Sequence, residues 1–258
     1  GREGVAMLAV TMAILLAWGH VVGSILTDLV GCNASLPFCN DTLPDLVRVE
    51  SVLALSTLSE RAAMLYGQGI PRLGVPPLRT GEALHGVVAD CGADPTGRPF
   101  CPTSFPCALN LAASFNDSLW RLVAAQIGTE SRALRPSGGA RFTPDINLFR
   151  DPRWGRGQEV PGEDPHLTSR YAVAFVSGLQ ADAQDPRRLK EIATCKHFFG
   201  YSVDAGNGSY GTHLEPNYDR HSFNAVISAA DLADYYLPPW RACAVEAGAG
   251  AVMCSYNA

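Results

Sequence analysis

The order of segments along the chain constrains its fold more than any other feature of the sequence. After residue 44, short apolar runs, polar loops and helical patterns follow one another in turn. Two of the apolar runs, 142–148 (FTPDINL) and 192–198 (IATCKHF), have the length of strands, and a polar loop and then a helical pattern follow each. This order is typical of parallel α/β proteins and predicts either a (β/α)8 barrel or a doubly wound open sheet.

The loops between strands and helices favour the barrel. A doubly wound sheet usually carries a glycine-rich phosphate loop, and neither GxGxxG nor GxxxxGK(S/T) occurs in the sequence. Polar residues gather instead directly after two strands, at 150–164 and 196–220, where the loops of a barrel form its catalytic face. A complete barrel needs about 250 residues, and the chain beyond its first ~40 residues has room for about four or five strands. The expected fold is therefore the N-terminal portion of a (β/α)8 barrel.

Capping residues and prolines indicate where the helices begin. Asp164 followed by Pro165 places a carboxylate at the helix cap and a proline at the first helical position. Ser228 and Asp231 resemble a capping box, and the helix behind them should be interrupted at Pro238-Pro239. Further helices are expected at 45–67 and from Asn116 or Asp117 onward, and a last strand is expected at 251–256.

The first 30 residues have the composition of a signal peptide. No Asp, Glu, Lys or Arg occurs from Val5 to Leu26, and small residues near Gly23-Ser24 mark a possible cleavage site. A membrane anchor and a buried helix are the alternatives. We therefore expect a secreted glycoprotein whose folded domain, residues 31–258, follows the segment 1–30. Four Asn-x-Ser/Thr sequons support secretion, at Asn33, Asn40, Asn116 and Asn207.

The cysteines and the charge balance limit the possible partners. Eight cysteines fit an oxidising compartment, and the absence of CxxC and HExxH leads us to expect no metal or other cofactor. A net charge of −5 without a basic run argues against nucleic acid, and a membrane would be a partner only through a retained anchor. Cys32 and Cys39 are spaced to close a short loop, Cys91, Cys101 and Cys107 cluster around turns, and Cys195 and Cys254 are expected to be buried free thiols.

Charged and polar side chains recur at corresponding positions after the strands. Each has an ordinary structural interpretation: a helix cap, a salt-bridged loop, an ion pair, a surface cation or a core tyrosine. Converging on one pocket, they would suit a polyhydroxylated ligand, because sugar hydroxyls both donate and accept hydrogen bonds. The candidates are Glu82 in RTGEALHGV, Arg156 in FRDPRWGRGQEVPGEDP, Lys196 and His197 in ATCKHFFGY, Arg220 in NYDRHSFNA and Tyr256 in MCSYN.

The motifs together resemble the N-terminal barrel of glycoside hydrolase family 3, in particular its plant and fungal β-xylosidase and α-arabinofuranosidase branch. The resemblance runs from about Leu36 to the last residue. It rests on IPRLGVPP, EALHGV, SFNDSLW, FTPDINLFRDPRWGRGQEVPGEDP, CKHFFGY and FNAVISAADLADYYLPPWRACAVEAGAGAVMCSYNA. The resemblance implies a (β/α)8 barrel and a retaining, exo-acting β-glycosidase that removes terminal xylosyl residues from an oligosaccharide substrate.

Carried over residue by residue, the resemblance makes all six candidates ligands of one sugar ring. Glu82 stands where the glucosidase branch has Asp, which favours a pentose. The family's nucleophile, an Asp, lies beyond the SYN motif, and its acid/base Glu comes from a following domain. No catalytic residue is therefore expected in this chain. A β-glucosidase of the same family and a non-catalytic sugar-binding fragment are the alternatives.

Overall fold

The computed structural model describes residues 35–93, 96–134, 138–184, 186, 188–204 and 220–257. The signal-like segment 1–30 and the sequons at Asn33 and Asn207 lie outside these residues. Within the described part of the chain, no helix has both the length and the apolar character needed to span a membrane.

The central element is a four-stranded sheet in the order β1 (Thr80–Glu82), β4 (Ala140–Phe142), β5 (Ile192–Phe198) and β6 (Ala251–Cys254). All three pairings are parallel. Helices lie between successive strands along the chain, as parallel pairing requires. The prediction of a parallel α/β fold is confirmed.

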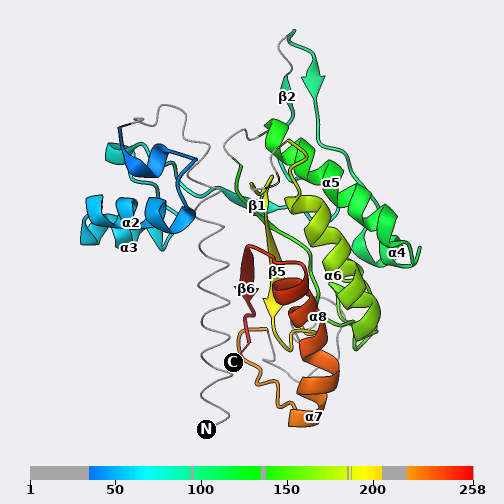
Figure 1. The fold of residues 1–258 in the computed structure, drawn as a ribbon. Coiled ribbons are helices and arrows are strands. Elements are labelled where there is room, and N and C mark those ends of the chain that lie inside the picture. The colour runs from blue at the N-terminus through cyan, green and yellow to red at the C-terminus, as the bar shows by residue number, and fades with distance from the viewer. Residues whose placement is uncertain are drawn as a thin grey trace.

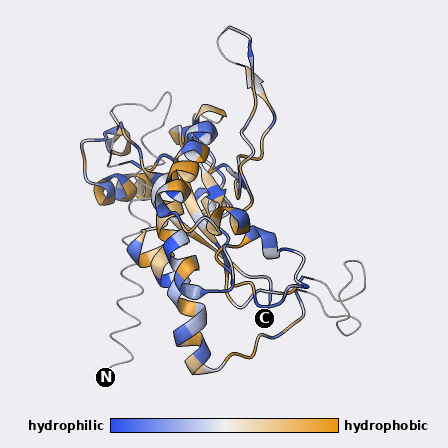
Figure 2. Cartoon of the chain, turned by 90° about the vertical axis from the view of Figure 1, so that its right-hand side faces the viewer, coloured by the Kyte–Doolittle hydropathy of each residue, from blue (hydrophilic) through white to orange (hydrophobic). Residues whose placement is uncertain are grey.

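Three helices cover one side of this sheet: α5 (Asp117–Leu134), α6 (Pro165–Gln180) and α8 (Leu237–Arg241). Figure 1 shows them side by side, with α6 in the middle. Between helices and sheet lies the main core, in which Trp120, Phe175 and Leu179 are almost completely buried. In Figure 2 hydrophobic and hydrophilic residues are interleaved along these helices, as expected for helices with one buried face.

The helix starts predicted from capping residues agree with the structure. Asp164 caps α6 by accepting hydrogen bonds from the backbone N–H groups of His166 and Leu167. Asn116, one of the two predicted caps of α5, accepts from the N–H of Leu119. Such side chains replace the missing partners of the first N–H groups of a helix, so they fix its start locally.

A smaller lobe precedes the sheet and has its own core. It contains η1 (Pro37–Cys39), α2 (Asp45–Leu55), α3 (Leu58–Met64) and η2 (Pro71–Leu73). Its buried residues are Phe38, Val52, Ile70, Leu73 and Val75. The single helix predicted over 45–67 is wrong, because Thr57 and Glu60 form a capping box that starts a second helix. Figure 1 shows this lobe beside β1, away from α6 and α8.

Three remaining segments complete the described fold. A two-stranded arm, β2 (Gly92–Ala93) with β3 (Pro99–Phe100), projects from the body, and α4 (Ala108–Ala112) precedes α5. The short 3-10 turn η3 (Gly157–Glu159) lies in the loop after β4. Between β5 and β6 a helical run contains α7 (Ala229–Asp231), the π-helical turns η4 (Leu232–Tyr236) and η5 (Ala242–Glu246), and α8 between them.

Two predicted boundaries differ from the structure near prolines. The strand expected over 142–148 is β4, which begins at Ala140 and ends at Phe142. Pro144 has no N–H to give to a ladder, and beyond it Asp145 alone forms a bridge within the described part of the chain, to Lys196. The interruption expected at Pro238-Pro239 does not occur. The helical run continues through both prolines, which are the second and third residues of α8, and π-helical turns flank α8 on either side.

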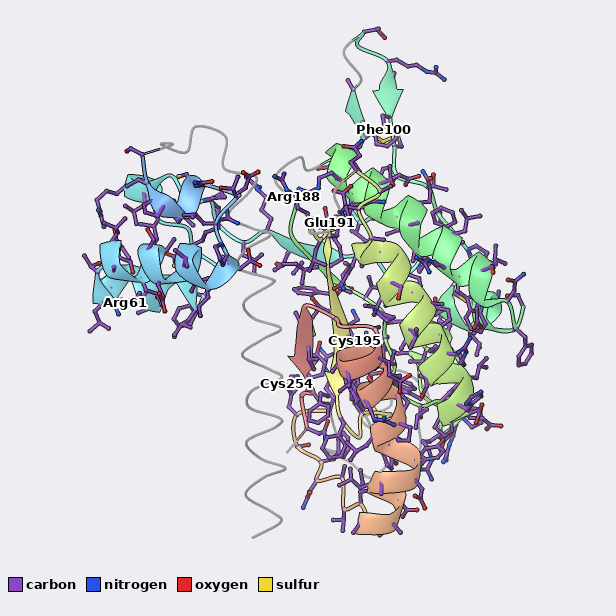
Figure 3. All side chains as sticks on the ribbon, viewed as in Figure 1. Arg61, Phe100, Arg188, Glu191, Cys195 and Cys254 are labelled. Atoms are coloured by element: carbon purple, nitrogen blue, oxygen red, sulfur yellow. A yellow bond between two sulfur atoms is a disulfide. The ribbon has the colours of Figure 1, made fainter. Side chains whose placement is uncertain are left out.

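The cysteines differ most from expectation. Cys195 is buried but is joined to Cys243 in a disulfide, so the predicted free thiol is wrong. Cys254 is free but exposed, because β6 lies at the edge of the described sheet and alternate side chains of this strand face outward. Cys91 pairs with Cys101 across the arm, and Cys107 stays free. Cys39 is also disulfide-bonded. Figure 3 shows Cys195 and Cys254 on the neighbouring strands β5 and β6.

Candidate sugar-binding site

The candidate site forms at the carboxyl edge of the parallel sheet. Glu82 ends β1, Lys196 and His197 lie near the end of β5, and Tyr256 follows β6. Parallel strands bring their carboxyl ends to one edge, so these side chains meet although they are far apart in sequence. Glu191, which Figure 3 shows at the start of β5, marks the opposite edge and forms a buried ion pair with Arg141.

Lys196 and Glu82 form an ion pair within the site. The Lys196 Nζ donates to the Glu82 Oε2 at 2.6 Å. The lysine side chain is 2% exposed, whereas that of the glutamate is 46% exposed. The carboxylate therefore compensates a buried ammonium group while presenting free oxygen lone pairs to the outside.

Arg156 is held by several oxygens from its own loop and beyond. Its Nε donates to Glu159 at 3.0 Å and its Nη1 donates to the Tyr201 hydroxyl at 3.2 Å. Its Nη2 also pairs with Glu159 and lies 3.8 Å from a carboxylate oxygen of Asp145. Burial acts to lower the pKa of this guanidinium, but these bonds outweigh it and raise the pKa above its ordinary value. Arg156 is thus a fixed positive charge.

His197 is a buried neutral ring among cations. Burial, together with the positive charges of Arg156, Lys196 and Arg220, lowers its pKa to about 3. Its ring lies edge-on to Tyr201, with 4.9 Å between the centroids, and 5.4 Å from the Tyr256 ring. At neutral pH the ring therefore carries one proton and one lone pair.

Arg220 and Tyr256 complete the cluster. The Arg220 guanidinium lies over the Tyr256 ring, 4.1 Å from its centroid. The structure therefore brings all six predicted site residues into one group. Glu82 bonds to Lys196, which precedes His197 in the chain. The His197 ring lies near Tyr256, and the charges of Arg156 and Arg220 act on it. Their role as sugar ligands stays a prediction.

Five residues at the site were not predicted from the sequence. Asp204 accepts from the Trp154 indole N–H at 2.8 Å and from the Tyr201 hydroxyl, and it lies 3.6 Å from the Arg220 guanidinium. Asp145 and Asn147 are buried beside His197. The signal for these two was present: polar residues two apart inside an apolar run must share one face of an extended chain. Tyr201, Trp154 and Asp204 left no comparable signal, because they meet only through loop folding.

Burial changes the acid chemistry of Asp145. Its pKa rises to about 7, because loss of solvent outweighs the hydrogen bond from the Asn147 N–H and the charges of Arg156 and Lys196.

Taken together, the cluster offers fixed cationic donors, an exposed carboxylate and a neutral imidazole. That combination suits a neutral, hydroxyl-rich ligand better than an ion. The described residues contain no group of three or more His, Cys, Asp or Glu placed to hold a metal ion.

Comparison with known proteins identifies one matching family model and several similar sequences. A family model described as the glycosyl hydrolase family 3 N-terminal domain matches residues 46–258. The chain is 45% identical over 232 residues to beta-D-xylosidase 3 of Arabidopsis thaliana. This match covers 87% of this chain and 29% of that protein. It is 40% identical over 264 residues to beta-xylosidase/alpha-L-arabinofuranosidase 2 of Medicago sativa subsp. varia, covering 96% of this chain and 33% of that one. The chain thus spans about a third or less of the curated relatives it matches.

Comparison with solved structures also finds glycosidases. An exo-β-xylosidase of glycoside hydrolase family 3, solved with a xylobiose aziridine activity-based probe, matches with a TM-score of 0.74 and 36% identity. That match covers 86% of this chain and 28% of the other. A β-glucosidase from Listeria innocua in complex with glucose matches with a TM-score of 0.54 and 30% identity, covering 76% of this chain and 23% of the other.

Proposed function

Because the chain belongs to glycosyl hydrolase family 3, we propose that it carries the sugar-binding subsite of a retaining, exo-acting β-xylosidase. The substrate would be the terminal β-D-xylosyl residue of a xylan-type oligosaccharide, with α-L-arabinofuranosyl residues as a second class. The xylosidase relatives and the 0.74 TM-score of the xylosidase structure, against 0.54 for the glucosidase, support this choice.

The observation that carries the proposal is the arrangement at the carboxyl edge of the sheet. Glu82, Lys196 and His197 come from strands β1 and β5, and Arg156 comes from the loop after β4. They present an acceptor, two cationic donors and a neutral ring to one region. Each hydrogen bond from a charged group to a sugar hydroxyl contributes about 1.5–3 kcal/mol where water is excluded.

In the proposed mechanism this chain binds and orients, and the bond-breaking carboxylates lie elsewhere in the full-length protein. A retaining glycosidase holds its nucleophile and its acid/base about 5–5.5 Å apart around the glycosidic bond. We place both beyond residue 258, in the part of the relatives that this chain does not span. Arg156 and Lys196 would hold the sugar ring in register with them. The four-stranded sheet would be the first part of a (β/α)8 barrel.

Secretion and glycosylation belong to the same proposal. The disulfides Cys91–Cys101 and Cys195–Cys243 support an oxidising compartment. The sequon residues Asn40 and Asn116 are both exposed, as an N-glycan requires.

The test is an assay of the chain extended to the length of its relatives, against nitrophenyl β-xyloside, α-arabinofuranoside and β-glucoside. The highest kcat/KM is expected for the xyloside. Lys196→Ala and Arg156→Ala should each lower kcat/KM at least tenfold, or ~1.4 kcal/mol, because each removes a charged donor from the transition state. Arg153→Ala is the matched control, since Arg153 lies in the same loop but, among the described residues, pairs with Asp151 alone, at the surface.

The alternatives give different results in the same assay. A preference for the glucoside would make the protein a β-glucosidase, and no hydrolysis of any substrate would make it a non-catalytic protein. Hydrolysis of the xyloside by residues 1–258 alone would contradict the placement of both carboxylates outside this chain. Near-normal kinetics in the Lys196 and Arg156 variants would return these residues to structural roles.

A further inference from the structure

Asn147 makes three contacts with a single residue, His197. Its Nδ2 donates to the His197 carbonyl at 2.8 Å, and its Oδ1 accepts from the His197 backbone N–H at 2.8 Å. The same Oδ1 lies 3.1 Å from the His197 ring Nδ1. Both side chains are buried.

The two backbone contacts fix which end of the amide faces the ring. A carbonyl only accepts and a backbone N–H only donates, so the Asn147 amide cannot be turned over without losing both bonds. Its oxygen must therefore face the Nδ1. Because that oxygen has no hydrogen to give, a hydrogen bond at 3.1 Å requires the proton to be on Nδ1.

The surroundings keep the ring at one proton. Three cationic side chains and burial disfavour the doubly protonated form. With Nδ1 protonated, Nε2 holds a bare lone pair. Among the described residues no hydrogen bond reaches Nε2.

From this geometry we propose that Asn147 is a positioning residue that holds His197 as the Nδ1–H tautomer, so that Nε2 accepts a hydrogen bond from a substrate hydroxyl. The second half of this statement rests on the proposed function. Arg156 and Lys196 only donate, so a hydroxyl that accepts from either of them needs an acceptor for its own hydrogen. The bare Nε2 would supply that acceptor, on a ring that already lies within the influence of the Arg156 and Lys196 charges.

Asp145 is the competing explanation for the proton on Nδ1. One of its carboxylate oxygens lies 3.5 Å from Nδ1, farther than the Asn147 oxygen. Its other oxygen accepts from the Asn147 backbone N–H at 3.1 Å. The test must therefore separate the amide from the carboxylate.

The tautomer is measured by long-range proton–nitrogen NMR on residues 1–258 with isotope-labelled histidine. The chain has six histidines, and the signal that disappears in His197→Gln identifies the ring. We expect Nδ1 protonated and Nε2 bare in the unmodified protein, and a mixture or reversal in Asn147→Leu. Asn147→Asp retains an accepting oxygen and should keep the Nδ1–H form. Asn110→Leu, at an exposed position on α4, should change nothing.

The kinetic consequence is tested in the extended enzyme. Asn147→Leu should lower kcat/KM about tenfold, as expected when a hydrogen-bond acceptor for substrate is lost. Asn147→Asp should be intermediate, because it keeps the tautomer but loses the bond to the His197 carbonyl. An Nε2–H ring in the unmodified protein would overturn the proposal, and so would an Nδ1–H ring that persists in Asn147→Leu, which would assign the proton to Asp145. The NMR measurement needs no substrate, so it fails or succeeds independently of the proposed function.

Discussion

At the scale of single residues, Asp145 links the site to the stability of the fold. It is buried, and one of its carboxylate oxygens has no hydrogen-bond partner within the described residues. Burial raises its pKa from the ordinary value of 3.8 to about 7. The folded chain therefore keeps a proton that the unfolded chain releases.

This shift predicts a pH-dependent loss of stability. The contribution of Asp145 is fully present below about pH 4 and is lost as the pH rises towards about 7, where the folded carboxyl also ionises. The loss reaches roughly 4 kcal/mol at most. Asp145→Asn cannot ionise, so it should not suffer this loss. The urea midpoint of the variant minus that of the unmodified protein should therefore increase from about pH 4 to about pH 7 and stay constant at higher pH.

The comparison with the variant is needed because His197 titrates in an overlapping range with the opposite sign. Its folded pKa is lowered, so its contribution is present above about pH 6.5 and is lost as the pH falls. Asp234→Asn, at an exposed carboxyl, is the control and should show no such trend. A difference between Asp145→Asn and the unmodified protein that stays constant with pH would contradict the burial argument.

The prediction of site residues from the sequence succeeded where a charge interrupted an apolar strand. Lys196 and His197 were found because a lysine in such a run needs partners. Asp145 and Asn147 were missed because the run that contains them was interpreted only as a strand. Their importance comes from the parallel alignment of two segments, which places Asp145 opposite Lys196. The sequence alone does not contain that register.

At the scale of elements, the disulfide Cys195–Cys243 connects β5, the strand of Lys196 and His197, to the helical run behind it. The two cysteines are 48 residues apart, against 10 for Cys91 and Cys101 in the arm. A longer loop closed by a disulfide removes more entropy from the unfolded chain, about 4 kcal/mol for the first pair and about 3 kcal/mol for the second.

Replacing each pair by alanines tests this order. Cys195→Ala with Cys243→Ala should lower the free energy of unfolding more than Cys91→Ala with Cys101→Ala, because the first pair also leaves a cavity in the main core. Urea unfolding of both double variants, with the exposed free cysteine variant Cys254→Ala as control, measures the difference. Equal losses from the two pairs would contradict the predicted order.

Element boundaries were predictable where the signal was local. The start of α6 follows from Asp164 and Pro165, which act within one turn of the helix. The break between α2 and α3 also has a local cause, the Thr57 and Glu60 box, but the continuous apolar spacing around it favoured one helix. The disulfide of Cys195 was not predictable, because spacing in sequence does not give pairing in space.

At the scale of the whole molecule, the described sheet ends in two strands with one neighbour each, β1 and β6. Alternate residues of β6 are exposed, and Val252 is 44% exposed. An edge strand with free backbone groups and an apolar outer face is a template for pairing with another chain. In the proposed barrel this edge would be covered by the next strand.

We therefore predict that residues 1–258, expressed alone, self-associate through β6. Val252→Lys should shift the protein towards monomer, because a charge on an edge strand opposes pairing between chains. Leu58→Lys is the matched control: Leu58 is 79% exposed on α3, away from the sheet edge, so the same charge placed there should have a smaller effect. Light scattering during size-exclusion chromatography measures the mass of each variant. Equal effects of the two lysines would assign association to general surface hydrophobicity, and a monomeric unmodified chain would show that the edge is already protected.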